Sequence, residues 1–110
     1  MSSPGVVVAI RYRALPGREE VARTELARLV ATVVAEESAC GGIRMLVDAD
    51  DPASILLVEE WPDRASYLGP HFETPHLKAF IARAGEWFAG PPEIGFWDEV
   101  DLEAGRAPRG

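Results

Sequence analysis

Two histidines, a glutamate and a tryptophan carry the chemistry that this sequence could perform. Glu59 and Trp61 end an apolar run, and His71 and His76 follow within a short segment. A neutral imidazole can remove a proton from a phenol or an activated C–H near pH 7, because its reference pKa lies close to that pH. A carboxylate such as Glu59 could fix the tautomer of that imidazole. Aromatic side chains would stack on a flat aromatic substrate.

Each of these residues also has a structural interpretation. His76 could be a partly exposed residue of a first helical turn, and His71 could serve in capping or packing. Trp61 could be a core or dimer contact, and Glu59 a salt-bridge partner or helix cap. Two histidines five positions apart do not give the one-face i, i+4 geometry of zinc motifs, so we expect no metal.

The elements that would position these residues follow from periodicity. Alternation predicts strands at residues 6–13, 43–48, 54–61 and 93–102. Apolar stripes at helical spacing predict helices at 18–38 and 75–88, with a short helix at 63–68. Thr74 and Pro75 are typical of an N-cap followed by proline in the first turn. Cys40, Gly41 and Gly42 are predicted to end the first helix, with glycine in the left-handed conformation.

The order strand, helix, strand, strand, helix, strand predicts an α+β fold. A split βαβ pattern gives a four-stranded antiparallel sheet of the ferredoxin-like βαββαβ type, with both helices on one face. The strands are apolar on both faces, and a bare apolar sheet face is unusual on a soluble monomer. We therefore predict a twofold homodimer in which two sheets pack together.

If the dimer covers one sheet face, a small molecule would bind between sheet and helices within each subunit. The strand pattern alone leaves open which face holds Glu59 and Trp61. Other candidates for contact with a small aromatic molecule lie on the strands, on the helices and beside His71. These candidates are Tyr12, Phe72, Phe80, Trp87 and Trp97.

Composition narrows the class of protein. The 110 residues predict one domain with a core at about 6–102 and tails at 1–5 and 103–110. The formal charge of −7 argues against nucleic acid and anionic membranes as partners. No apolar run is long enough to span a bilayer, and the first residues do not resemble a secretory signal. The single Cys40 excludes an internal disulfide and fits a cytoplasmic location.

The motifs Glu59-x-Trp61 and His71-x-x-Thr74-Pro75-His76 resemble the antibiotic biosynthesis monooxygenase family over about residues 6–102. The resemblance implies a dimeric α+β barrel with a pocket between sheet and helices. It also implies oxygenation of a phenolic, quinol or polyketide-type aromatic compound without metal or flavin, with His71 as the catalytic position.

Departures from the family pattern narrow the expectation. Haem-degrading members use an Asn near the first strand and a His later in the last helix. This chain has no Asn and no His after His76, which disfavours a haem-degrading role. The segment from His71 to His76 most resembles the quinol-monooxygenase-like group. Two other hypotheses stay open: a non-catalytic, stress-associated dimer that binds a metabolite, and an isomerase or cyclase in which His71 and Glu59 move protons without oxygen.

Overall fold

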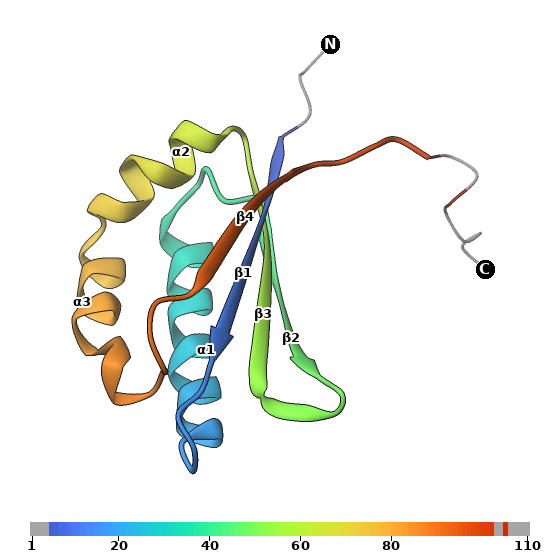
Figure 1. Cartoon of the computed structure of the whole chain (residues 1–110). Helices are drawn as coiled ribbons and strands as arrows, with labels where there is room; N and C mark the ends of the chain where they lie inside the picture. Colours follow the sequence, from blue (N-terminus) through green and yellow to red (C-terminus); the bar gives the residue numbers. More distant parts are fainter. Residues whose placement is uncertain (1–4, 103–104, 106–110) are drawn as a thin grey trace.

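The computed structural model describes residues 5–102 and 105. The chain forms β1 (Val6–Arg13), α1 (Glu19–Glu36), β2 (Gly42–Asp48), β3 (Asp51–Trp61), α2 (Arg64–Leu68), η1 (Pro70–Glu73), α3 (Pro75–Arg83), η2 (Ala84–Glu86) and β4 (Glu93–Asp98). The strands form one antiparallel sheet in the order β2-β3-β1-β4. Figure 1 shows the helices stacked on one side of the sheet. The predicted ferredoxin-like fold is confirmed.

Strand register decides which residues lie under the helices. Leu57 pairs with Ile10 on β1, and Ile10 pairs with Ile94 on β4. Directly opposed residues in an antiparallel pair point to the same face of the sheet. Glu59 and Trp61 lie on the same face as Leu57, because alternate residues of a strand share a face. The helix-covered face therefore carries Glu59 and Trp61, and the core is built around it.

Several predicted boundaries are wrong, and among them β3 begins at Asp51 and not at residue 54. The helix α1 ends at Glu36, and Glu37 leaves the helix with extended backbone at φ −109°, ψ 98°, so no left-handed glycine ends it. The last long helix is shorter than predicted, since α3 ends at Arg83 and tightens into the 3-10 turn η2. The strand β4 ends at Asp98, so residues 99–102 lie outside it.

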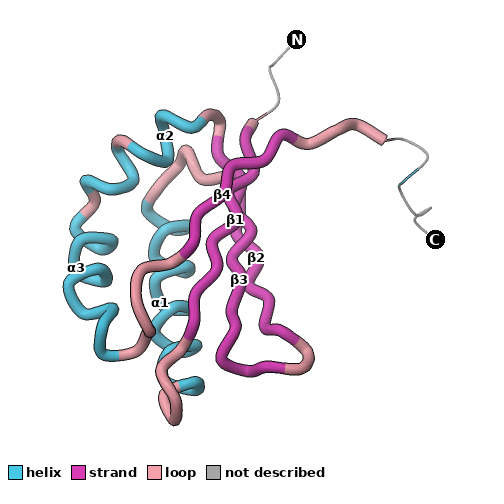
Figure 2. Tube along the Cα trace, in the orientation of Figure 1, coloured by secondary structure: helices cyan, strands magenta, loops and turns pink. Residues whose placement is uncertain are grey.

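A loop then links η2 to β4 (Figure 2). Its Gly90 has a positive φ of 78°, a backbone conformation that L-residues with a Cβ rarely adopt.

The outer face of the sheet carries apolar side chains without helices over them. Trp97 is 62% exposed and Leu46 is 40% exposed. Val7, Ala9, Leu56 and Val58 on the central strands are only half-buried. An open face of this kind is what the dimer prediction rests on.

None of the helices in the described part of the chain has the length and apolarity that crossing a bilayer requires. Of the tails predicted at 1–5 and 103–110, residues 1–4, 103–104 and 106–110 lie outside the described residues.

Candidate active site

A cavity of about 450 Å³ lies between the helix-covered face of the sheet and the helices α1 and α3. Most of its lining is apolar, as in small-molecule sites generally. The ionisable side chains that line it are Tyr12, Glu59, Tyr67 and His71. The cavity therefore combines an apolar wall with a small set of groups that can exchange protons or hydrogen bonds.

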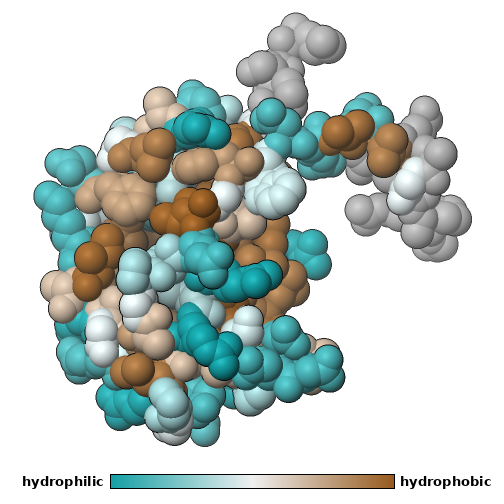
Figure 3. All heavy atoms as spheres, viewed as in Figure 1, coloured by the Kyte–Doolittle hydropathy of each residue, from teal (hydrophilic) through white to brown (hydrophobic). Residues whose placement is uncertain are grey.

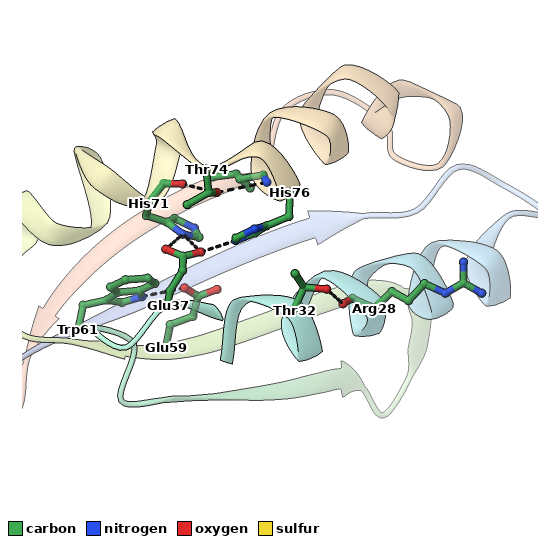
Figure 4. A network of polar contacts seen from close by, with 9 residues as sticks. Arg28, Thr32, Glu37, Glu59, Trp61, His71, Thr74 and His76 are labelled. Atoms are coloured by element: carbon green, nitrogen blue, oxygen red, sulfur yellow. Dashed lines mark hydrogen bonds and ion pairs between the residues drawn. The ribbon is translucent and has the colours of Figure 1, made fainter. Parts of the chain in front are cut away.

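One carboxylate, Glu37, binds both histidines of the chain. Its two oxygens each lie 2.9 Å from His71 Nδ1, and Oε2 lies 2.6 Å from His76 Nε2. Figure 4 shows the two imidazoles converging on this carboxylate from the segment above α1. Glu37 lies at the C-terminal end of α1, where the chain turns into extended backbone. The exit of the chain from the helix thus places the carboxylate beneath η1 and α3.

The Glu37 contacts decide which nitrogen of each ring carries a proton. A carboxylate can only accept, so His71 donates from Nδ1 and His76 donates from Nε2. Among the described residues, no hydrogen bond reaches His71 Nε2. His71 is 4% exposed and lines the cavity. In its neutral form it therefore offers an unprotonated Nε2 for a bound molecule.

Local structure holds the two histidines in place. Thr74 caps α3 by accepting a hydrogen bond from the Leu77 amide at 3.3 Å, and Pro75 occupies the first turn. The Thr74 hydroxyl also donates to the His71 carbonyl at 2.8 Å. The predicted N-cap is confirmed, and it joins η1 to α3 so that both imidazoles reach Glu37.

Glu59 lies in the floor of the cavity and is 3% exposed. Its Oε1 accepts a hydrogen bond from the Trp61 indole N–H at 2.9 Å. Burial raises the pKa of the Glu59 carboxyl from 4.5 to about 7, the Trp61 hydrogen bond opposes that rise, and the charge of Glu37 adds to it. Glu59 is therefore a carboxyl that exchanges its proton near neutral pH. The carboxylate that orients His71 is Glu37 and not Glu59, contrary to the sequence-based expectation.

Two phenols complete the polar set. Burial raises the pKa of both Tyr12 and Tyr67, and the nearby charge of Glu59 raises each further. Both hydroxyls therefore stay protonated near neutral pH. Within residues 5–102, no hydrogen bond engages either hydroxyl, so both can bind a polar group of a ligand.

The predicted site residues fall into two groups. Tyr12, Glu59, His71, Phe72 and Phe80 line the cavity. Trp61 lies behind the lining, with its ring centroid 4.8 Å from that of His71, so it supports the site from the core. His76 binds Glu37 without lining the cavity. Trp87 packs on Phe80 outside the lining, and Trp97 lies on the outer face of the sheet.

Glu37 and Tyr67 were missed by sequence reasoning. Glu37 left a signal, because it continues the apolar stripe of α1 four residues after the buried Val33. A carboxylate at a position that faces the interior needs a buried partner. The sequence signal for Tyr67 is weaker, because the five residues of α2 are too few to show a periodic apolar pattern.

Among the described residues, no group of three or more histidine, cysteine, aspartate or glutamate side chains is arranged to hold a metal ion. The Glu37 oxygens and the imidazole nitrogens lie at hydrogen-bonding distances from each other.

Comparison with known proteins gives a family and a fold. The family model described as "Antibiotic biosynthesis monooxygenase" matches residues 5–83. None of the curated proteins matches the chain significantly.

Several solved structures are similar. PA3566 from Pseudomonas aeruginosa is 24% identical with a TM-score of 0.81, over 92% of this chain and 99% of that one. Rv0793 from Mycobacterium tuberculosis is 22% identical with a TM-score of 0.76, over 90% and 98%. A structure described as an antibiotic biosynthesis monooxygenase is 24% identical with a TM-score of 0.76, over 87% and 99%. At these identities the likeness supports the fold alone.

Proposed function

This chain belongs to the antibiotic biosynthesis monooxygenase family, and on that premise we propose that it oxygenates a small phenolic, quinol or polyketide-type aromatic compound without a bound cofactor. The observation that carries the proposal is the Glu37–His71 contact, which leaves Nε2 of a buried, cavity-lining imidazole as the proton acceptor. The segment from His71 to His76 favours a substrate of the quinol type.

The reaction balances with molecular oxygen as the only co-reactant. His71 Nε2 takes the proton of a phenol, and the resulting electron-rich phenolate passes one electron to O₂. The two radicals combine to form a C–O bond, after which the O–O bond breaks and water leaves. For a hydroquinone, the ring C–H is replaced by C–OH and the ring is oxidised, so that hydroquinone plus O₂ gives hydroxyquinone plus H₂O.

The other polar groups have roles that fit this chemistry. Glu37 is a positioning residue, because it holds the tautomer of His71 from outside the cavity. Glu59, with a pKa of about 7, can return a proton to the departing oxygen. The hydroxyls of Tyr12 and Tyr67 can donate hydrogen bonds to a developing carbonyl. Phe72 and Phe80 supply apolar surface for the aromatic ring.

Oxygen uptake with a panel of hydroquinones and anthrones tests the proposal. We expect His71→Gln to lower kcat by ~10²-fold or more, because the general base is lost. His76→Gln is the matched control, since it removes the other imidazole bound to Glu37 but none that lines the cavity. A smaller loss is expected for it. An unchanged rate in His71→Gln would exclude the imidazole as the base.

A proton-shuttling isomerase or cyclase is the second candidate, and the Glu59 carboxyl favours it. A group with a pKa of about 7 in the same cavity as an imidazole can act as acid while the imidazole acts as base. Turnover that persists under anaerobic conditions would support this candidate against the monooxygenase. Ligand protection against thermal unfolding without product under either condition would instead indicate a binding protein.

We also propose that two copies pair through the outer face of the sheet. The support is the row of half-buried and exposed apolar side chains on that face, which includes Leu56, Val58 and Trp97. Sedimentation velocity should give the mass of a dimer, and Val58→Glu should shift it toward the monomer, because a carboxylate would be buried without a partner. A monomer at all concentrations would refute the pairing.

A further inference from the structure

The cavity has a closed end and an open end. Glu59, Tyr67 and His71 are all buried. The exposed lining residues belong to α3, η2, the following loop and β4; we call this set the mouth. The mouth consists of Ile81, Gly85, Gly90, Pro91 and Ile94. A ligand that reaches the polar groups must therefore point its other end toward α3 and β4.

The described lining of the cavity carries no lysine or arginine side chain. The ionisable side chains among the described lining residues are a glutamate, a histidine and two tyrosines: Glu59, His71, Tyr12 and Tyr67. The carboxylate of Glu37 lies directly behind His71. A carboxylate or phosphate on the ligand would therefore face negative charge in a desolvated site, which disfavours it. A neutral hydroxyl or carbonyl group meets proton donors and acceptors instead.

The mouth is apolar where it meets solvent. Ile81 on α3 is 52% exposed and Ile94 on β4 is 41% exposed. On the face seen in Figure 3, hydrophobic atoms cover part of the surface in the area of α3 and β4. A compact polar molecule would leave these side chains in water. A ligand with a hydrocarbon chain would cover them as the chain leaves the cavity.

We infer that the ligand is an uncharged phenol or quinol with an alkyl or isoprenoid chain, whose hydroxyl lies near His71 and whose chain leaves between Ile81 and Ile94. This inference rests on the proposed function for the placement of the hydroxyl. It adds the class of substituent and the exclusion of acidic aromatic compounds. The cavity volume of about 450 Å³ accommodates an aromatic ring and part of a chain.

Calorimetric binding of 4-ethyl-, 4-butyl- and 4-heptylphenol tests the inference independently of oxygenation. We expect the dissociation constant to fall roughly two- to fourfold for each methylene that is buried, and then to level off as the chain reaches solvent. At pH 8, 4-heptylbenzoate should bind at least ~10-fold more weakly than 4-heptylphenol. Equal binding of the benzoate, or no dependence on chain length, would overturn the inference.

A substitution in the mouth tests where the alkyl chain of the ligand leaves the cavity. Ile81→Glu should weaken 4-heptylphenol more than 4-ethylphenol, and so reduce the ratio of the two affinities by ~10-fold. Val34→Glu is the matched control, because Val34 is a 50% exposed helical residue that does not line the cavity; it should keep the wild-type ratio. An unchanged ratio in Ile81→Glu would refute the exit route.

The two proposals fail separately. Chain-dependent binding without oxygen uptake would contradict the monooxygenase and leave the ligand class standing. Oxygen uptake that does not depend on the alkyl chain of the substrate would support the monooxygenase and contradict the inferred ligand class.

Discussion

The two faces of the sheet receive alternate residues of the same strands, yet they present different chemistry. On β3, Leu57 and Glu59 lie under the helices and are nearly inaccessible, whereas Leu56 and Glu60 lie on the outer face. Burial changes what a side chain can do: it raises the pKa of Glu59 to about 7 and raises the pKa of the phenols Tyr12 and Tyr67, so that they stay protonated. The outer face keeps its groups near solvent and so is suited to contact with another surface. Neighbouring residues thus give matched pairs that test this difference.

The largest effect is expected at the leucine pair. Leu57→Ala should lower the free energy of unfolding by about 2–5 kcal/mol, because Leu57 is 1% exposed and packs in the core. Leu56→Ala should cost less at low protein concentration, since that side chain is only half-buried. Urea denaturation measures both. If Leu56 lies in a dimer interface, its cost will grow with protein concentration; equal costs at every concentration would abolish the contrast between the faces.

The glutamate pair should differ in pH dependence. Between pH 4.5 and 7 the folded protein keeps a proton on Glu59 that the unfolded chain has released, so its stability falls as pH rises through this window. The fall amounts to about 3 kcal/mol at most. Glu59→Gln should remove it, and the variant should exceed the wild type in stability above pH 7. Glu60→Gln should keep the wild-type fall, and a flat wild-type profile would refute the assignment.

Glu37 and Glu36 form a third pair, at the end of α1. Glu37→Gln should cost about 2 kcal/mol of stability, because hydrogen bonds of a carboxylate to two imidazoles are lost or weakened. The variant should also change the pH dependence of kcat/KM, which a purely structural role would not alter. Glu36→Gln, at an exposed position, is the control. An unaltered pH profile in Glu37→Gln would show that Glu37 does not position the base.

The smallest effect is expected at the indole beneath Glu59. Trp61→Phe keeps an aromatic side chain but removes the pyrrole ring of the indole with the N–H that lowers the pKa of Glu59. We expect the loss of this hydrogen bond to lower the free energy of unfolding by about 1 kcal/mol. The pKa of Glu59 should rise, so the part of the pH–rate profile that depends on Glu59 should shift to higher pH. Trp87→Phe is the control, because Trp87 is buried outside the cavity lining. A shift to lower pH would contradict the role of this hydrogen bond.

Much of this architecture could be predicted from local patterns. Alternation in the strands and the apolar stripes of the helices gave the order of elements, and Thr74-Pro75 correctly marked the start of α3. An apolar pattern can continue beyond the last hydrogen-bonded residue of an element, so the predicted ends of α1, α3 and β4 were wrong. Which sheet face the helices cover depends on packing across the whole chain, so the placement of Glu59 could not be decided beforehand.

The partner of His71 could not be predicted for a related reason. Glu37 lies 34 positions away in the sequence, and no local spacing links the two residues. Glu59 lies nearer to His71 in the sequence than Glu37 does, so local reasoning favours Glu59. The contact between Glu37 and His71 depends on where α1 ends, because Glu37 is the first residue to leave the helix and adopts extended backbone.

The contacts of Glu37 with His71 and His76 also constrain how a bound molecule enters and leaves the cavity. Lifting η1 and α3 away from α1 would break the contacts to both imidazoles together, so this movement should be a rare, concerted opening. Its signature would be amide protons near the end of α1 and the start of α3, such as those of Glu37 and Leu77, that exchange with deuterium at a common slow rate. Entry and exit of a ligand at the opposite end of the cavity, past Gly90, would not require η1 and α3 to open.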